Sequence, residues 1–294
     1  MLNDTTYVLG KLDWMRGNRI WPNGLRYLWT DAFGVVLLVS LHAKLKQDAY
    51  LSDAEWVVAE VDRVLGRRRG IRIGEESDRD GQNFHYLAMW LYALSVLGRY
   101  IPSYREKGIE LAKQIHGPFL VPGHGIHWKM IEDLGGPYPG YGLGALDAFD
   151  GYVSYRMLDE TALAEEIADM RSLIELSERE LVITQDLGLG MMLWMTHFFP
   201  EESWAMIQRR RSLVMLDRMW WPEGYFCREP HYPHVKFAFT NYGVSAGLQA
   251  AGAMPDRVNR LNRYFATHRS GDEYDESAIT HVMACTSHFP GLML

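Results

Sequence analysis

The sequence predicts an all-α protein of the (α/α)6 toroid class, in which six helical hairpins follow one another around an axis. Two observations predict this fold. Helical segments that are apolar on nearly every side alternate with amphipathic, charged segments. The 294 residues divided over six hairpins leave about 49 for each, close to the spacing of the apolar segments. We therefore expect residues 1–294 to form one domain with an inner and an outer ring of helices.

The predicted inner helices are segments whose apolar residues cover every side, because such a helix must be buried all round. Six segments qualify: 25–45, 82–100, 146–158, 187–199, 237–251 and 276–289. Five amphipathic segments follow them as predicted outer helices: 52–65, 103–115, 160–180, 201–217 and 255–267. The sixth outer helix is either supplied by the N-terminal segment or absent. No run alternates with the two-residue period of a strand for long, so no strand is predicted.

The connections between these helices differ in length. Turns from inner to outer helices are short, whereas those from outer to inner helices are long: 66–81, 117–145, 219–236 and 268–275. Long loops within a compact domain usually carry function. We therefore expect the functional site at the N-terminal ends of the inner helices.

Composition limits the class of protein. The net charge of −7 disfavours a nucleic-acid-binding surface. The N-terminus has no signal-peptide pattern, and the longest apolar runs, 33–41 and 187–195, are about half the ~20 residues of a membrane span. Two cysteines, Cys227 and Cys285, fit a reducing compartment. We expect a cytoplasmic protein with a small-molecule substrate and no nucleic-acid or membrane partner; the oligomeric state stays open.

The acidic candidates gather at the starts of the predicted inner helices. Asp78 and Asp80 stand on either side of Arg79, with His85 one turn further on, which suits a general acid and its electrostatic partner. Alternatively, Asp80 only caps the helix. Asp31, Asp147 and Asp150 open other inner helices, and each alone also fits a capping role. Together they predict a ring of acids.

The longest loop supplies a second set of candidates. Trp128 and Lys129 suit the binding of a polar or anionic group, and Asp133 is a further candidate acid. The alternative is an ordered loop packed on its own aromatic side chains. His281, inside the last inner helix, is either an acid/base in the centre of the toroid or a core histidine.

Aromatic residues of the inner helices are expected to line the substrate pocket, where aromatic faces suit a sugar ring or a carbocation. The full set of expected substrate-binding residues on these helices is Trp29, His85, Tyr86, Trp90, Phe149, Asp150, Trp194, Asn241 and Tyr242.

No metal or cofactor is expected. The pairs His124/His127 and His231/His234, the latter near Cys227, lie in loops and lack the helical spacing of known zinc motifs. No nucleophile elbow, P-loop or dinucleotide-binding glycine motif occurs.

Four stretches resemble bacterial proteins of the six-hairpin glycosidase-like superfamily: SDRDGQNFHYLAMWLYAL, HWKMIEDLGGPYP, LDAFDGYVSY and ITHVMACTSHFP. The resemblance implies the (α/α)6 fold. The wider superfamily includes glycoside hydrolases, unsaturated glucuronyl hydrolases and sugar epimerases, which place acids or histidines at the mouths of the inner helices. The positions that match are Asp78, Asp80, Gln82, His85, Tyr86, Trp128, Lys129, Asp133, Asp147 and Asp150.

The sequence also departs from that superfamily. Ala88-Met89 stands where Thr-Lys is usual, Leu146 where histidine is usual, and Thr280-His281 where Asn-Glu is usual. The loss of charged groups suggests a more hydrophobic substrate than an ordinary sugar.

Three functions follow from these residues. In the first, an enzyme acts on a sugar-like molecule as a glycoside hydrolase or epimerase, with Asp80 or Asp133 as general acid and Asp147 or Asp31 as second carboxylate. In the second, a cyclase or isomerase of a hydrophobic metabolite uses Asp80, its pKa raised by aromatic surroundings, as proton donor. Trp29, Trp90, Phe149 and Trp194 then stabilise a cation. The third is a non-catalytic binding protein, in which Asp78 and Asp80 are bound to arginine or backbone groups.

Overall fold

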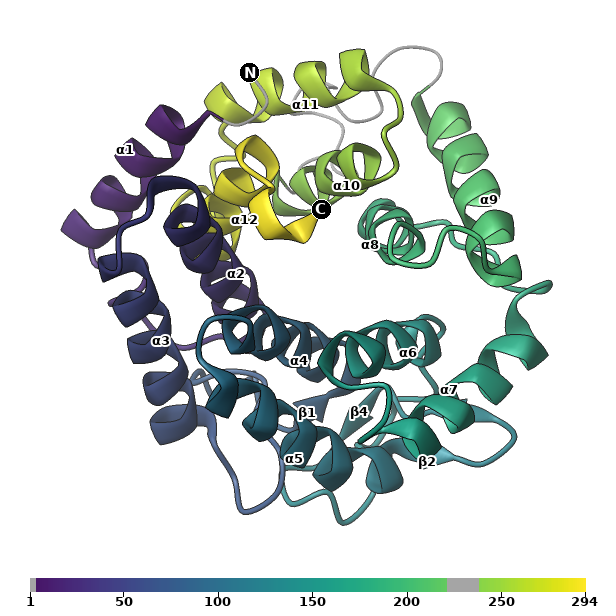
Figure 1. Ribbon diagram of the computed structural model, residues 1–294. Coiled ribbons are helices and arrows are strands. Elements are labelled where there is room, and N and C mark those ends of the chain that lie inside the picture. Colours follow the sequence, from purple (N-terminus) through teal and green to yellow (C-terminus); the bar gives the residue numbers. More distant parts are fainter. Residues whose placement is uncertain (1–3, 221–237) are drawn as a thin grey trace. The chain divides into compact units, whose positions relative to one another are not determined.

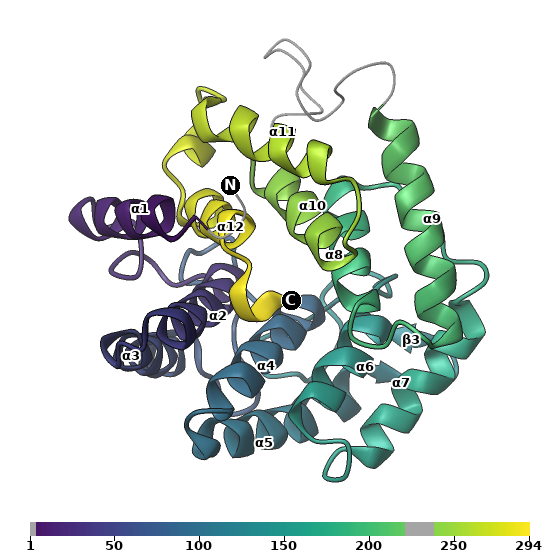
Figure 2. The ribbon, with the colours of Figure 1, turned by 45° about the horizontal axis from the view of Figure 1, so that its top comes forward.

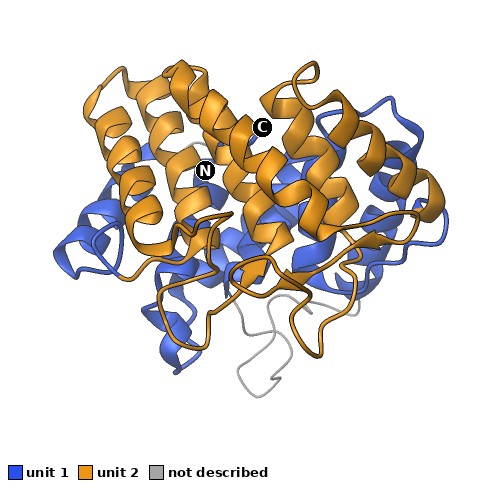
Figure 3. Cartoon of the chain, turned by 90° about the horizontal axis from the view of Figure 1, so that it is seen from below, with its two compact units in different colours: residues 1–24, 178–294 blue, residues 25–177 orange. Residues whose placement is uncertain are grey.

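The computed structural model describes residues 4–220 and 238–294, which contain twelve α-helices and four two-residue strands. The chain divides into two compact units, residues 1–24 with 178–294 and residues 25–177, coloured separately in Figure 3. Each unit is described by itself. A single domain over residues 1–294 therefore stays a prediction.

The unit of residues 25–177 holds three helical hairpins: α2 (Leu28–Leu45) with α3 (Ala49–Leu65), α4 (Phe84–Gly98) with α5 (Pro102–Phe119), and α6 (Asp147–Leu158) with α7 (Ala164–Ser177). Helix α4 packs between α2 and α6 (Figure 1). Its sequence, FHYLAMWLYALSVLG, has no carboxylate, lysine or arginine, and it is buried almost throughout. Helix α3 instead buries residues spaced by three and four, such as Ala54, Val57 and Val61, as an outer helix should.

The other unit holds α8 (Asp186–Thr196) with α9 (Ser203–Trp220), α10 (Ala238–Ala250) with α11 (Pro255–Thr267), and α12 (Ala278–His288) with α1 (Thr5–Gly17). Two short 3-10 helices, Glu273–Asp275 and Gly291–Met293, flank α12. Helix α10 packs between α8 and α12 (Figure 2). Helix α1 packs on α12, so the N-terminal segment supplies the sixth outer helix.

Helices α8 and α10 approach each other through glycine. A Cβ atom on Gly247 would lie 2.1 Å from the carbonyl oxygen of Gly190, a distance that no side chain tolerates. The two backbones are therefore in direct contact.

The strands lie in or next to the two long loops of the unit of residues 25–177, and one of the two strand pairs links these loops. β1 (Gln82–Asn83) pairs antiparallel with β4 (Lys129–Met130), and β2 (Leu120–Val121) pairs with β3 (Gly125–Ile126). The sequence predicted no strand, because two residues are too short to show a two-residue period. The pairing holds both loops at the N-terminal ends of α4 and α6, where the sequence predicted the site.

Helix α2 is, among the described helices, the one that is long and apolar enough to cross a membrane. However, 78% of its apolar window is buried inside the protein. This degree of burial is that of a core helix.

Candidate functional site

A histidine–aspartate pair lies where α4 and α6 begin. His85 is the second residue of α4, and Asp150 is in the first turn of α6. The Nδ1 atom of His85 lies 2.6 Å from Oδ2 of Asp150. The Asp150 side chain is 2% exposed, whereas that of His85 is 17% exposed. A buried carboxylate thus orients an imidazole whose ring reaches the surface, which is the arrangement of a general base and its positioning group.

A second carboxyl group, that of Asp147, adjoins this pair. Burial and the neighbouring Asp150 carboxylate raise the pKa of Asp147 to about 8, so the group is mostly neutral at pH 7. The nearby backbone N–H groups of Asp147 and His85 favour the anion and partly oppose this rise in pKa. The Oδ1 atom of Asp147 has no hydrogen-bond partner among the described residues. The Asp147 carboxyl group therefore lies at the starts of both α4 and α6.

The proton affinity of His85 is set by two opposed effects. Burial disfavours the imidazolium ion, but the charge and the hydrogen bond of Asp150 outweigh burial and raise the pKa of His85. The imidazole is consequently a stronger base than a free histidine.

Aromatic side chains cover one side of His85. The ring centre of Trp29 lies 4.6 Å from that of His85 and 5.4 Å from that of Tyr86. The hydroxyl groups of Tyr86 and Tyr27 are 2.7 Å apart, and the guanidinium of Arg79 lies 4.2 Å from the Tyr27 ring centre. Three aromatic rings thus extend from the histidine to the 66–81 loop.

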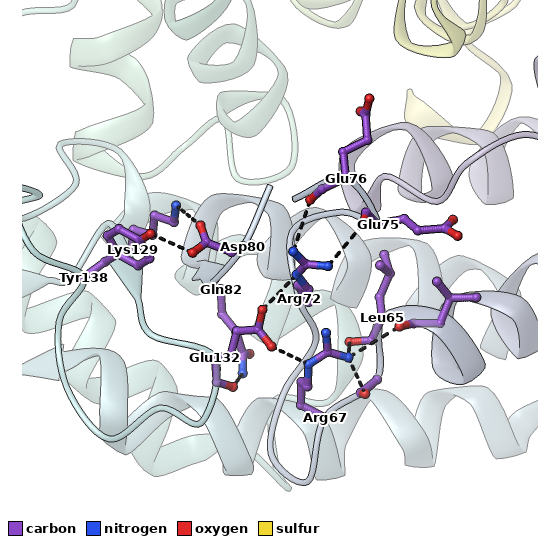
Figure 4. Close-up of polar contacts among 12 residues, drawn as sticks. Leu65, Arg67, Arg72, Glu75, Glu76, Asp80, Gln82, Lys129, Glu132 and Tyr138 are labelled. Atoms are coloured by element: carbon purple, nitrogen blue, oxygen red, sulfur yellow. Dashed lines mark hydrogen bonds and ion pairs between the residues drawn. The ribbon is translucent and has the colours of Figure 1, made fainter. Parts of the chain in front are cut away.

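Asp80 occupies a different environment from the one expected (Figure 4). Tyr138 donates a hydrogen bond to its Oδ2 at 2.7 Å, and Nζ of Lys129 lies 3.1 Å from its Oδ1. The hydrogen bond from Tyr138 and the ammonium of Lys129 lower the pKa of Asp80. The expected rise in this pKa is therefore wrong, and Asp80 is an anion at neutral pH. It does not cap α4 either: Asn83 does, by accepting the N–H of Tyr86 at 3.3 Å.

Glu132 fastens the two long loops together (Figure 4). Its carboxylate forms ion pairs with Arg67 at 2.8 Å and with Arg72 at 2.9 Å. The side chain of Gln82 donates to the carbonyl oxygens of Arg69 and Glu132 and accepts the N–H of Ile71. Sequence reasoning missed Glu132 and Arg67, and nothing in the sequence marks a pair 65 residues apart.

The remaining predicted acids of this unit lie in less suitable settings. Asp31 is buried in an ion pair with Arg26 at 3.1 Å and accepts the N–H of Tyr27, so it stabilises the start of α2. Asp133 is exposed and accepts the N–H of Gly135 within a turn. Asp78 is exposed in the 66–81 loop.

Three predicted binding residues of this unit divide between core and surface. Trp90 in α4 and Phe149 in α6 are fully buried. Trp128 is 39% exposed, and its ring centre lies 4.9 Å from that of Tyr141. Trp90 and Phe149 thus sit in the core, whereas Trp128 is open to a ligand.

Four predicted site residues belong to the other unit. Trp194 is buried and donates its indole N–H to the carbonyl oxygen of Met293 at 2.8 Å. Asn241 and Tyr242 are buried in α10. The ring of His281 in α12 meets the ring of Trp14 edge-on, with 4.6 Å between centres. Burial, together with the charge of Lys11, lowers the pKa of His281 to about 4.

The structure describes only some of the residues that were considered as metal ligands. His231, His234 and Cys227 lie outside the described residues, and His124 contacts the carbonyl oxygen of Pro122. Within residues 4–220 and 238–294, no three His, Cys, Asp or Glu side chains lie close enough together to hold a metal ion.

Comparisons with known proteins reveal the fold. No protein-family profile and no curated protein sequence matches the chain. A cellobiose 2-epimerase from Spirochaeta thermophila DSM 6192 is similar in structure, with a TM-score of 0.65, 14% identity, and coverage of 91% of this chain and 86% of that one. A sugar epimerase from a ruminal bacterium is similar with a TM-score of 0.61 and 12% identity, and the match covers 90% of this chain and 87% of that one. A family 76 glycoside hydrolase from a bovine Bacteroides thetaiotaomicron strain is similar with a TM-score of 0.59 and 13% identity, and the match covers 91% of this chain and 69% of that one. These likenesses confirm the predicted all-α (α/α)6 fold.

Proposed function

We propose that this protein is an enzyme that isomerises or epimerises a sugar, with His85 as the base that moves a proton at a carbon next to the sugar's carbonyl group. The His85–Asp150 pair carries the proposal, because it is the described acid/base group that combines an oriented imidazole with access from the surface. The similar structures named cellobiose 2-epimerase and sugar epimerase support a sugar as substrate.

The proton transfer follows from the hydrogen bonding of His85. Its Nδ1–H donates to Asp150, so Nε2 holds the free lone pair. In an open-chain aldose, carbon 2 adjoins the carbonyl carbon, and removal of its proton leaves an enediolate. Nε2 takes that proton, and the Asp150 carboxylate balances the charge of the imidazolium that forms. When the enediolate rotates about its C2–C3 bond and turns its other face to the imidazolium, return of the proton to carbon 2 yields the epimer. Delivery of the proton to carbon 1, with transfer of the O2 proton to O1, yields the ketose.

The surroundings of the pair suit this step. Because Asp147 is mostly neutral at pH 7, the imidazolium and Asp150 together carry no net charge. The partly exposed ring of Tyr86 offers an apolar surface to a sugar ring, and the buried ring of Trp29 packs behind it. The anion of Asp80 and the ammonium of Lys129 stand in the adjoining loops, where hydroxyl groups of a substrate can bind.

Glycoside hydrolysis is the second candidate. A carboxyl group with a pKa of about 8, that of Asp147, is protonated at pH 7 as a general acid of hydrolysis must be. The similar family 76 glycoside hydrolase supports this candidate too.

The cyclase interpretation is not carried forward. It requires Asp80 as a proton donor, and the lowered pKa of Asp80 makes that carboxyl group an anion. A cytoplasmic location and a small-molecule substrate remain part of the proposal.

The test is proton exchange at carbon 2. The enzyme is incubated in D₂O with glucose, cellobiose and related reducing sugars, and NMR follows deuterium at carbon 2 and the appearance of the epimer or ketose. We expect both signals, and His85→Asn should slow them by roughly 10²–10⁴-fold. His116→Asn is the matched control, since His116 contacts Asp169 at 3.1 Å between the outer helices α5 and α7. It should leave the rate unchanged.

Two outcomes decide against this proposal. Cleavage of disaccharides without exchange at carbon 2 would favour hydrolysis through Asp147. Neither exchange nor cleavage with any of the sugars would leave the non-catalytic binding protein as the better interpretation.

A further inference from the structure

An apolar groove with a volume of about 540 Å³ lies within the unit of residues 178–294. One wall is formed by Val182 and Ile183 in the segment before α8, and the other by Ile207, Val214 and Met215 of α9. Val182 is 66% exposed and Val214 is 45% exposed, so the apolar lining is open to solvent. A concave site of this size with mostly apolar walls suits a small ligand.

The polar groups of the groove are all cationic or neutral. Arg210, Arg211 and Arg218 line it, and no carboxylate does. Asp217, the neighbour of Arg218 in sequence, is paired with Arg257 of α11 at 2.5 Å. The groove is thus positive although the chain as a whole carries a charge of −7.

The arginines 209–211 have three different environments. Arg209 donates to the carbonyl oxygen of Ala251 at 2.7 Å, and Arg211 donates to the carbonyl oxygens of Glu178 and Leu181 at 3.4 and 3.1 Å. Arg210 and Arg218 are exposed, with no ion pair to any described residue. Their charges remain available to an anion.

Ser212 gives independent support for a ligand. Its side chain lines the groove, the residue is 1% exposed, and its hydroxyl group has no hydrogen-bond partner among the described residues. A buried hydroxyl without a partner is unfavourable, so an acceptor atom brought by a ligand would be stabilised there.

We propose that this groove binds a small amphiphile with one anionic head group, such as a medium-chain carboxylate. The apolar chain lies between Val182 and Val214. The head group accepts a hydrogen bond from the hydroxyl group of Ser212, and the positive charges of Arg210 and Arg218 attract it. This site is independent of the proposed sugar chemistry, since all its residues lie in the unit that does not contain His85.

Isothermal titration of the whole protein tests the proposal with three probes: octanoate, 1-octanol, which lacks the charge, and butyrate, which lacks most of the chain. We expect octanoate to bind about three- to tenfold more tightly than octanol and at least about tenfold more tightly than butyrate. Absence of octanoate binding, or equal binding of all three probes, would overturn the proposal.

Substitutions locate the site. The double variant Arg210→Gln/Arg218→Gln should weaken octanoate binding about three- to tenfold and leave octanol binding unchanged. Ser212→Ala should weaken octanoate binding about threefold. Val214→Glu, which puts a carboxylate on an exposed wall, should abolish it. Arg209→Gln is the matched control and should bind octanoate normally. Melting curves establish that each variant is folded, and equal octanoate affinity in all folded variants would contradict this location.

Discussion

Two histidines near the starts of inner helices, one in each unit, have opposite electrostatic environments. His85 in α4 contacts the buried carboxylate of Asp150, and its pKa is raised. His281 in α12 lies beside Trp14 and near Lys11, and its pKa falls to about 4. The same residue type on the same kind of helix is thus a stronger base in one unit and a ring that stays neutral down to about pH 4 in the other. The neighbours, more than the helix position, decide which histidine suits proton transfer.

The largest expected effect concerns the partner of His85. Asp150→Asn keeps the shape but removes the charge, so kcat/KM for exchange at carbon 2 should fall by about 10²-fold or more. Because Asp150 raises the pKa of His85, the rise of rate with pH should move to lower pH in this variant. A pH–rate profile measures both changes, with Asp169→Asn as control. A fall in rate without the shift in pH would mean that Asp150 only supports the fold.

A smaller effect is expected for His281→Phe, on the pH dependence of the free energy of unfolding. A histidine whose pKa is lowered by folding resists protonation, so the folded state loses stability as the pH falls from about 6.5, the unfolded value, to about 4. His281→Phe removes this loss. The free energy of unfolding of the variant should therefore fall by about 2–3 kcal/mol less than that of the wild type between pH 6.5 and pH 4. Urea titrations at pH 7 and pH 4 measure it. The control is His124→Phe at an exposed loop position, which should leave the pH dependence of the free energy of unfolding unchanged. The same pH dependence in His281→Phe as in the wild type would contradict the lowered pKa of His281.

The sequence predicted the helices well because burial patterns are local. Each of the six apolar segments forms one of the predicted inner helices. The sequence left undecided only whether the N-terminal segment, now α1, forms the sixth outer helix. The site was predicted less well, because contacts across 49 to 65 residues decide it. His85 and Asp150 were both candidates, but their pairing needs α4 beside α6. Asp80 was assigned the wrong role because Tyr138, 58 residues away, supplies its hydrogen bond.

The smallest expected effect concerns Asp80. Asp80→Asn leaves Lys129, 8% exposed, without its anion, but Asp80 itself is 37% exposed, so the loss of stability should stay near or below about 1 kcal/mol. The lowered pKa of Asp80 means that its contribution is present above pH ~4 and is lost as the pH falls through the folded value. Wild type and variant should therefore differ at pH 7 and coincide near pH 2 in thermal melts. A difference that persists near pH 2 would point to packing.

The contact of Gly190 with Gly247 limits which residues this pair of helices accepts. A Cβ atom on Gly190 would lie 2.5 Å from the carbonyl oxygen of Gly243, so any larger residue at 190 or 247 forces α8 and α10 apart. The α9 wall of the apolar groove packs on α8. A substitution at Gly190 that displaced α8 would therefore also change the width of the groove.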